Sequence, residues 1–124
     1  MLHASDVDIA FMVDSTASMG RYIDQVKNHI ADIVQNIVEK FNDSHVRIGF
    51  VGYRDYTEGK ARFEVLDMTH SIQTFVRYVG LVHAYAGGDV PEDVLGALDK
   101  TLALSWKAPT KIIFHIGIAI ICCL

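Results

Sequence analysis

A nearly unbroken apolar segment close to the start of the chain, Val7 to Val13, most constrains how this sequence can fold. It is rich in β-branched residues and is followed at once by polar ones, which is typical of a strand buried on both faces of a parallel sheet. We therefore expect a central strand there. From Gly20 to Phe41 apolar residues recur at helical spacing, which predicts a long amphipathic helix packed on that sheet.

Three further segments have the pattern of strands. Apolar residues alternate with others over 46–53 and again over 63–65, on either side of the polar loop Arg54 to Lys60. Because only this loop separates them, the two strands could pair as a hairpin. A last strand is expected at Lys111 to Ile116.

Two shorter helices are expected between these strands. Ser71 can cap a helix over 72–82, because a serine hydroxyl accepts a hydrogen bond from the backbone of the first helical turn. Pro91 to Asp93 would open another helix that runs to Leu102, since proline and acidic residues both favour a first turn.

The order strand, helix, strand, strand, helix, helix, strand predicts an α/β fold. We expect a doubly wound, mostly parallel sheet with helices on both faces. With 124 residues, 51% of them hydrophobic and 21% charged, the sequence is that of one ordinary globular domain. We assign residues 6–124 to that domain and residues 1–5 to an N-terminal tail.

Charge and cysteine usage bear on partners and compartment. The net charge of -4 at pH 7 gives no electrostatic reason to expect nucleic acid or an anionic membrane, so partners are expected to be proteins or metal ions. Cys122 and Cys123 are adjacent and cannot form the spaced disulfide framework of small secreted domains. The residues after Met1 lack the pattern of a secretory signal, and we expect a cytoplasmic protein.

The longest apolar run, Ile112 to Leu124, is interpreted as a buried strand. It contains His115 and is shorter than the roughly 17 to 25 residues that cross a bilayer.

The main candidate site follows the first strand, where Asp14, Thr16 and Ser18 lie two residues apart. In extended backbone such side chains point the same way, at the sheet edge where open α/β folds bind ligands. Carboxylate and hydroxyl oxygens suit a hard cation such as Mg²⁺, or Mn²⁺ in its place. Asp89, in the sequence Gly87 to Glu92 before another helix, could complete the oxygen shell.

These motifs resemble the metal-ion-dependent adhesion site of von Willebrand factor A domains. The resemblance extends from about Asp6 to Ile116 and rests on the Asp-x-Thr-x-Ser loop and on the Gly-Gly-Asp-x-Pro-Glu turn at 87–92. It is closest to the intracellular members attached to alpha-kinases, which also resemble this chain at 52–55, Gly-Tyr-Arg-Asp. The family fold is the same α/β fold that the element order predicts.

The resemblance also implies residue roles and a function. It makes Asp14, Thr16 and Ser18 the metal ligands of the first loop, with Asp89 where many members have a threonine. It implies a protein-binding module, not an enzyme, in which a carboxylate from a partner protein completes the coordination of the ion.

The chain departs from the family pattern after its last predicted strand. An Asp of a third metal loop would fall at about Ile118, but the stretch from Gly117 to Leu124 has no carboxylate. No residues remain for the last two strands of the family, so we expect a truncated domain. Metal affinity should then be weaker than in a complete site, and the fourth strand should be an exposed edge capable of self-association.

Several singled-out residues have simpler interpretations. Ser18 could be only a helix cap, and Asp89 only a capping residue before a proline. Arg54 and Asp55 could line the metal cleft or form an ion pair or turn at the surface. His115 is expected to be a core histidine on a central strand, and the spacing of the other histidines does not indicate zinc.

Two other function classes stay open. A phosphotransfer enzyme similar to haloacid-dehalogenase-like phosphatases would use Asp14 as nucleophile, but Thr16 stands where such enzymes normally have a second Asp. A truncated isoform without independent function is the other alternative. Kinase activity is not expected, because the chain has no glycine-rich phosphate loop with its lysine.

Overall fold

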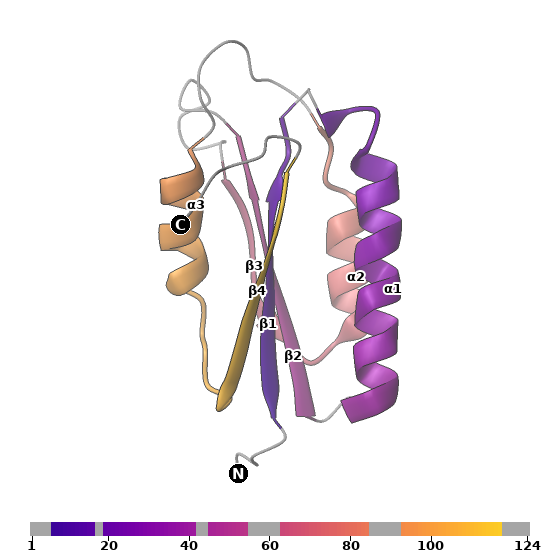
Figure 1. Cartoon of the computed structure of the whole chain (residues 1–124), viewed down its shortest axis with the longest axis vertical. Helices are drawn as coiled ribbons and strands as arrows, with labels where there is room; N and C mark the ends of the chain where they lie inside the picture. Colours follow the sequence, from indigo (N-terminus) through magenta and orange to yellow (C-terminus); the bar gives the residue numbers. More distant parts are fainter. Residues whose placement is uncertain (1–5, 17–18, 42–44, 55–62, 85–92, 118–124) are drawn as a thin grey trace.

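The computed structural model describes residues 6–16, 19–41, 45–54, 63–84 and 93–117. Their elements follow the predicted order, and the predicted α/β fold class is confirmed (Figure 1). The elements are β1 (Val7–Asp14), α1 (Ile23–Phe41), β2 (Val46–Tyr53), β3 (Phe63–Thr69), α2 (Ile72–Gly80), α3 (Val94–Leu102) and β4 (Thr110–Ile116).

The four strands form one sheet in the order β3-β2-β1-β4. β1 runs parallel to both of its neighbours, which confirms that it is central, and β3 pairs antiparallel with β2, which confirms the predicted hairpin. At the far end of β1, Asp14 lies opposite Tyr53 of β2, and Val13 lies opposite Ile116 of β4. The carboxyl ends of three strands therefore meet at one edge of the sheet.

The helices cover both faces of the sheet, with α1 and α2 on one face and α3 on the other (Figure 1). The core beside α1 and α2 contains these buried side chains: Val7, Ile9, Phe11, Val13, Ile30, Val34, Val46, Ile48, Phe50, Phe75, Val79 and Val82. Phe11 is at its centre, with ring centroids 5.7 Å from Phe75 and 5.2 Å from Phe114. Burying one such ring contributes about 1.5 to 3 kcal/mol.

The core on the other face is smaller because a single short helix covers it. Its buried members are Ala10, Met12, Val51, Tyr53, Ala97 and Leu104. Successive residues of β1 thus alternate between two cores, which explains why its sequence is apolar at nearly every position.

Local sequence explains where the helices begin. Ser71 Oγ accepts a hydrogen bond from the Thr74 backbone N–H at 3.1 Å and caps α2 as predicted. α3 begins at Val94, later than predicted, because Asp93 is its cap and accepts from the Gly96 N–H at 2.8 Å. A Cβ atom at position 96 would collide with the Asp93 carboxylate, so this cap requires glycine. α1 begins at Ile23, also later than the predicted Gly20.

β4 lies at an edge of the described sheet, as predicted for the fourth strand. Its side chains alternate, with Phe114 and Ile116 half-buried towards α1 and Ile113 and His115 exposed on the other face. The interpretation of this strand as fully buried, with His115 in the core, is therefore wrong. An edge strand has only one neighbouring strand. On this face of the sheet α3 does not cover β4, so Ile113 and His115 stay accessible.

None of the helices in the described ranges is both long enough and apolar enough to cross a membrane.

Candidate functional site

Asp14 and Thr16 meet where β1 ends. Both side chains are buried, with 4% and 1% of their surface exposed. Asp14 Oδ1 accepts two hydrogen bonds from Thr16, one from its backbone N–H at 2.9 Å and one from its hydroxyl at 2.6 Å. The structure thus brings together two of the four predicted ligands. Ser18 and Asp89 lie outside the described residues.

The neighbouring strand β2 holds this turn in place through main-chain contacts. The Ser15 N–H donates to the Tyr53 carbonyl at 2.8 Å, which continues the β1–β2 pairing one residue past the strand. A Cβ atom at position 52 would lie only 2.9 Å from Ser15 Oγ, so any side chain there would force the buried Ser15 hydroxyl to move, and glycine avoids this. Gly52 and Tyr53 belong to the segment 52–55 that carries part of the family resemblance. This packing gives a physical reason for a glycine at position 52.

Tyr53 and His115 lie beside the same turn. The Tyr53 hydroxyl and His115 Nε2 are 2.7 Å apart in a hydrogen bond that links β2 to β4 across β1. Although His115 is exposed as a whole, partial burial of its ring beside Tyr53 lowers its pKa, and the negative charge of Asp14 partly opposes this effect. The lowered pKa favours the neutral imidazole beside Asp14. Sequence reasoning did not find this pair, because it depends on strand order.

The two oxygens that the structure describes at this edge, from Asp14 and Thr16, are of the kind that a hard cation prefers. A buried carboxylate is costly unless a positive charge or hydrogen bonds compensate it, and the two donors that Thr16 provides to Asp14 are neutral. Among the residues that the structure describes, no three His, Cys, Asp or Glu side chains are grouped closely enough to hold a metal. An ion here would therefore depend on the Thr16 hydroxyl, on Ser18 and Asp89, and on water.

Arg54 directly follows β2 at this edge and is fully buried, with 0% of its surface exposed. Its guanidinium forms an ion pair with Glu64 of β3 and donates from Nη2 to the His83 carbonyl at 2.8 Å. The ion pair expected for Arg54 is therefore present, but its expected place at the surface is wrong, because the arginine is buried. Asp55, named with it, lies outside the described residues.

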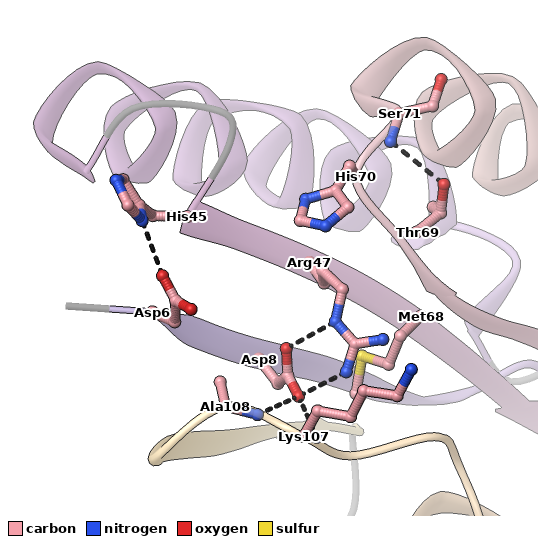
Figure 2. Close-up of a pocket in the computed structure, with 10 residues that line it drawn as sticks. All are labelled: Asp6, Asp8, His45, Arg47, Met68, Thr69, His70, Ser71, Lys107 and Ala108. Atoms are coloured by element: carbon pink, nitrogen blue, oxygen red, sulfur yellow. Dashed lines mark hydrogen bonds and ion pairs between the residues drawn. The ribbon is translucent and has the colours of Figure 1, made fainter. Parts of the chain in front are cut away.

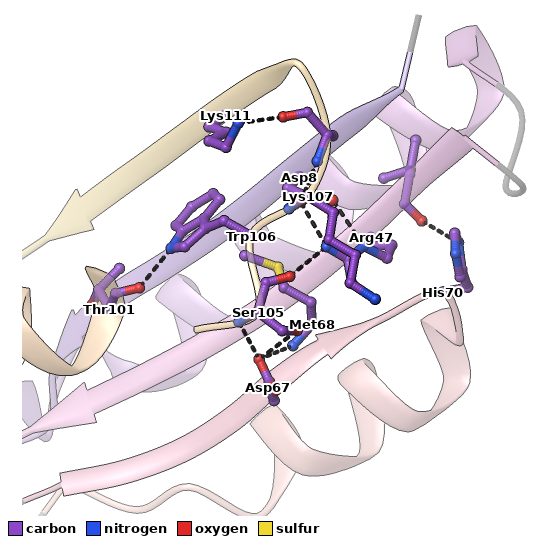
Figure 3. Close-up of polar contacts among 12 residues, drawn as sticks. Asp8, Arg47, Asp67, Met68, His70, Thr101, Ser105, Trp106, Lys107 and Lys111 are labelled. Atoms are coloured by element: carbon purple, nitrogen blue, oxygen red, sulfur yellow. Dashed lines mark hydrogen bonds and ion pairs between the residues drawn. The ribbon is translucent and has the colours of Figure 1, made fainter. Parts of the chain in front are cut away.

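A second polar cluster, missed by sequence reasoning, lies at the opposite end of the strands from Asp14, near the start of β1 (Figures 2 and 3). Asp8 is buried and accepts from Arg47 Nε at 2.9 Å and Nη2 at 2.7 Å, and from the N–H groups of Lys107 at 2.6 Å and Ala108 at 2.9 Å. Burial alone would raise the pKa of Asp8, but these hydrogen bonds and the Arg47 charge lower it overall.

This cluster lines an open cavity of about 830 Å³. Its lining residues are Asp6, Asp8, His45, Arg47, Met68, Thr69, His70, Ser71, Lys107 and Ala108. Arg47 also donates to the Ser105 carbonyl at 2.6 Å, so its contacts bind β1, β2 and the segment before β4 together. Since Asp8 and Arg47 are occupied with protein atoms, we interpret the cluster as a structural clamp.

Comparison with known proteins identifies relatives of this chain. The sequence model of the family described as von Willebrand factor A domain matches residues 8–119. The alpha-protein kinase vwkA of Dictyostelium discoideum is 33% identical over 112 residues, which are 90% of this chain and 18% of that protein.

Solved structures with a similar fold include the pilus adhesin SpaC of Lactobacillus rhamnosus GG. Its open conformation superimposes with a TM-score of 0.53 and 18% identity, covering 64% of this chain and 11% of the adhesin. A second form of the adhesin gives a TM-score of 0.54 and 17% identity, covering 65% and 11%. At this identity the likeness concerns the fold alone.

Proposed function

This chain belongs to the von Willebrand factor A domain family, whose members are protein-interaction modules, and we propose that its Asp14 edge binds a partner protein through a divalent cation. The observation that carries the proposal is the pairing of a buried carboxylate, Asp14, with the Thr16 hydroxyl at the carboxyl edge of the central strand. Open α/β sheets bind ligands at this edge. We assign residues 6–124 to the module and residues 1–5 to a tail.

Asp14, Thr16, Ser18 and Asp89 would hold Mg²⁺, or Mn²⁺ in its place. The bound ion would supply a positive charge that attracts a carboxylate from the partner. Thr16 fixes the orientation of the Asp14 carboxylate. The hydrogen-bonded Tyr53 and His115 lie on the two strands that flank β1. Because residues 117–124 contain no side-chain carboxylate, we expect binding weaker than that of a site whose third loop supplies an Asp.

A binding role explains these residues better than an enzymatic one. A phosphotransfer reaction would need an acid placed beside the nucleophile Asp14, and the group that contacts Asp14 at that position is the Thr16 hydroxyl. The kinase relative is matched over 18% of its length, and the matched region is the part that the von Willebrand factor A family covers. We therefore assign no catalytic residue to this chain.

Two further properties are part of the proposal. The adjacent cysteines, which give no spaced disulfide framework, favour a cytoplasmic protein. The exposed edge strand β4, with Ile113 37% exposed, favours weak self-association by edge pairing.

Calorimetric titration of the purified chain with Mg²⁺ and Mn²⁺ tests the metal site. We expect saturable binding that is lost in Asp14→Ala and Asp14→Asn and is retained in Asp32→Asn, which changes an exposed carboxylate in the middle of α1. Metal should also raise the melting temperature of the wild type but not of the two Asp14 variants, because a ligand that binds only the folded state stabilises it. A folded sample that binds neither metal at millimolar concentration contradicts the proposal.

A further inference from the structure

One oxygen of the buried Asp14 carboxylate has no hydrogen bond from the part of the chain that the structure describes. Thr16 gives both of its hydrogen bonds to Oδ1, and no described group donates to Oδ2. Asp14 is only 4% exposed, and a buried carboxylate oxygen without a donor is costly. Oδ2 is therefore the oxygen at which a cation, or a water that the cation carries, would compensate this cost.

The space beside Oδ2 lies on the β4 side of Asp14, at Gly117. Gly117 is exposed and comes directly after β4. A Cβ atom built there would lie 4.0 Å from Asp14 Oδ2 and 3.7 Å from the Tyr53 hydroxyl oxygen, and its nearest contact would be Asp14 Cβ at 3.6 Å. These are ordinary van der Waals distances, so an alanine would fit at this position. Glycine leaves the space next to both oxygens open.

The side chains of Asp14, Tyr53 and His115 project from the same face of the sheet. Tyr53 lies opposite Asp14 in the register of β1 and β2, and it belongs to the core on the α3 face. His115 lies opposite Met12, which belongs to the same core and precedes Asp14 by two residues. Alternate residues of a strand share a face, so Asp14 projects from that face too. The Tyr53 hydroxyl crosses β1 to reach His115 and therefore lies near the end of β1 that carries Asp14.

The direction of the Tyr53–His115 hydrogen bond decides what else the hydroxyl can bind. The lowered pKa of His115 favours the neutral imidazole, in which one ring nitrogen carries no proton and can only accept. When Nε2 is that nitrogen, the Tyr53 hydroxyl donates its proton to it. Towards any other neighbour the Tyr53 oxygen then acts only as an acceptor. Water bound to a metal ion turns its protons outwards, so an acceptor of this kind suits it.

We infer that Tyr53 is a positioning residue of the metal site, whose hydroxyl, held by His115, accepts a hydrogen bond from a water of the ion bound at Asp14. The inference rests on the proposed function for the ion itself. Mg²⁺ usually keeps several of its waters in proteins, so the groups that hold those waters contribute to affinity. Supporting residues of this kind typically change metal affinity by about 10- to 100-fold when mutated.

Two substitutions remove this contact without removing a metal ligand. Tyr53→Phe keeps the buried ring and removes the hydroxyl, and Gly117→Ala places a methyl group in the space beside Asp14 Oδ2. We expect each to lower the Mn²⁺ affinity about 10- to 100-fold in a calorimetric titration. The matched controls are Tyr78→Phe, whose ring packs on the opposite face of the sheet, and Gly80→Ala, where a Cβ atom has no neighbour within 4 Å. Both controls should stay within about twofold of the wild type, because distant sites seldom couple.

Substitutions of His115 separate a positioning role from a packing role. His115→Gln offers a side-chain oxygen that can accept from the Tyr53 hydroxyl, whereas His115→Leu offers no acceptor. The histidine is exposed, so neither change removes a core residue. We expect the Mn²⁺ affinity to fall about 10-fold in His115→Leu and to recover most of that loss in His115→Gln.

The direction of the hydrogen bond can be measured without metal. Nitrogen NMR of the histidine rings, with the His115 signals assigned by their absence in His115→Gln, distinguishes a protonated from an unprotonated ring nitrogen. We expect Nδ1 of His115 to carry the proton and Nε2 to carry none. Nε2 found protonated overturns the inference, because the Tyr53 hydroxyl would then turn its own proton away from His115.

The metal titrations distinguish failure of the inference from failure of the proposed function. Wild-type protein that binds Mn²⁺, loses it in Asp14→Ala and keeps full affinity in folded Tyr53→Phe overturns the inference alone. If Tyr53→Phe does not fold, His115→Leu takes its place, and full affinity in that variant has the same meaning. Folded wild-type protein that binds no Mn²⁺ overturns the proposed function, and the inference with it.

Discussion

The Thr16 side chain donates its hydroxyl proton to Asp14 Oδ1 at 2.6 Å, and the Thr16 backbone N–H donates to the same oxygen. The carboxylate is therefore oriented before any ligand arrives. Both residues are buried, so neither can change rotamer freely to accommodate an ion. A site built in this way loses little side-chain entropy on binding, which favours affinity per contact.

Replacing Thr16 by valine tests this orientation, because valine keeps the shape of threonine and the backbone N–H and removes only the hydroxyl. We expect the Mg²⁺ and Mn²⁺ affinities to fall at least about 10-fold, since one ligand oxygen and one orienting hydrogen bond are lost. Metal-free stability should fall by only about 1 kcal/mol, the net value of one hydrogen bond. Thr16→Ser, which restores the hydroxyl, should recover most of the affinity in the same calorimetric titration.

Asp14 and Thr16 were predictable from sequence because their proximity is local. A run of apolar residues identifies the strand, and period-two geometry places alternate side chains after it on one side. Asp8 was not predictable in the same way. It accepts hydrogen bonds from Arg47, 39 residues later, and from Lys107, 99 residues later, and no local pattern indicates either contact.

The burial of Arg54 and the exposure of His115 show the same limit. Arginine after a strand is usually a surface residue. Arg54 is buried because β3, the segment after α2 and α3 come together around it, which no local sequence pattern indicates. His115 follows apolar residues and therefore looks like a core residue. Its exposure follows from the edge position of β4, which is a property of strand order.

Gly52 should be intolerant of any side chain. A Cβ atom there would lie 2.9 Å from Ser15 Oγ and 3.1 Å from the Phe50 ring, so Gly52→Ala must displace these buried side chains beside the turn between Asp14 and Thr16. We expect a loss of about 1 to 3 kcal/mol in the free energy of unfolding, as for other overpacked sites, together with weaker metal binding.

Gly80→Ala is the control for that substitution. Gly80 is the last residue of α2, and nothing lies within 4 Å of a Cβ atom built there. Alanine in this position should stabilise the chain by about 0.4 to 1 kcal/mol, because it restricts the unfolded state without a clash. Urea unfolding of the two variants gives both values, and an equal effect of the two substitutions would contradict the packing argument.

The clamp at Asp8 predicts a specific acid sensitivity. The pKa of Asp8 is lowered in the folded state, so the folded protein binds the proton less tightly than the unfolded chain does. Its contribution to stability is therefore complete above the ordinary carboxyl pKa of about 3.9 and is lost as the pH falls through the lower folded value. At pH 7, Asp8→Asn should cost about 3 kcal/mol, because Arg47 loses its ionic partner.

The measurement is denaturant unfolding of wild type and Asp8→Asn between pH 7 and pH 3. The difference between the two should stay constant down to about pH 4 and then shrink, since the protonated carboxyl resembles the amide. Asp99→Asn, at an exposed position on α3, should show no such difference at any pH. If the difference in free energy of unfolding between the wild type and Asp8→Asn persists unchanged to pH 3, the expected titration of Asp8 is contradicted.

The exposed edge of the sheet leads to the last prediction. Within the described sheet β4 pairs with β1 alone, and its outward face presents Ile113, 37% exposed, between the charged Lys111 and the polar His115. Two copies related by a twofold axis could pair these edges antiparallel. One apolar residue per strand provides little burial, so the association should be weak and should increase with protein concentration.

Ile113→Lys should abolish that association, because two lysines on facing strands repel each other and natural edge strands use lysine to prevent pairing. The side chain already lies partly in water, so the folded monomer should lose less than about 1.5 kcal/mol of stability. Sedimentation velocity at increasing concentration distinguishes the outcomes. If wild type and Ile113→Lys sediment identically, β4 is not the contact, and if only the variant stays monomeric while its metal affinity is unchanged, self-association and cation binding use separate surfaces.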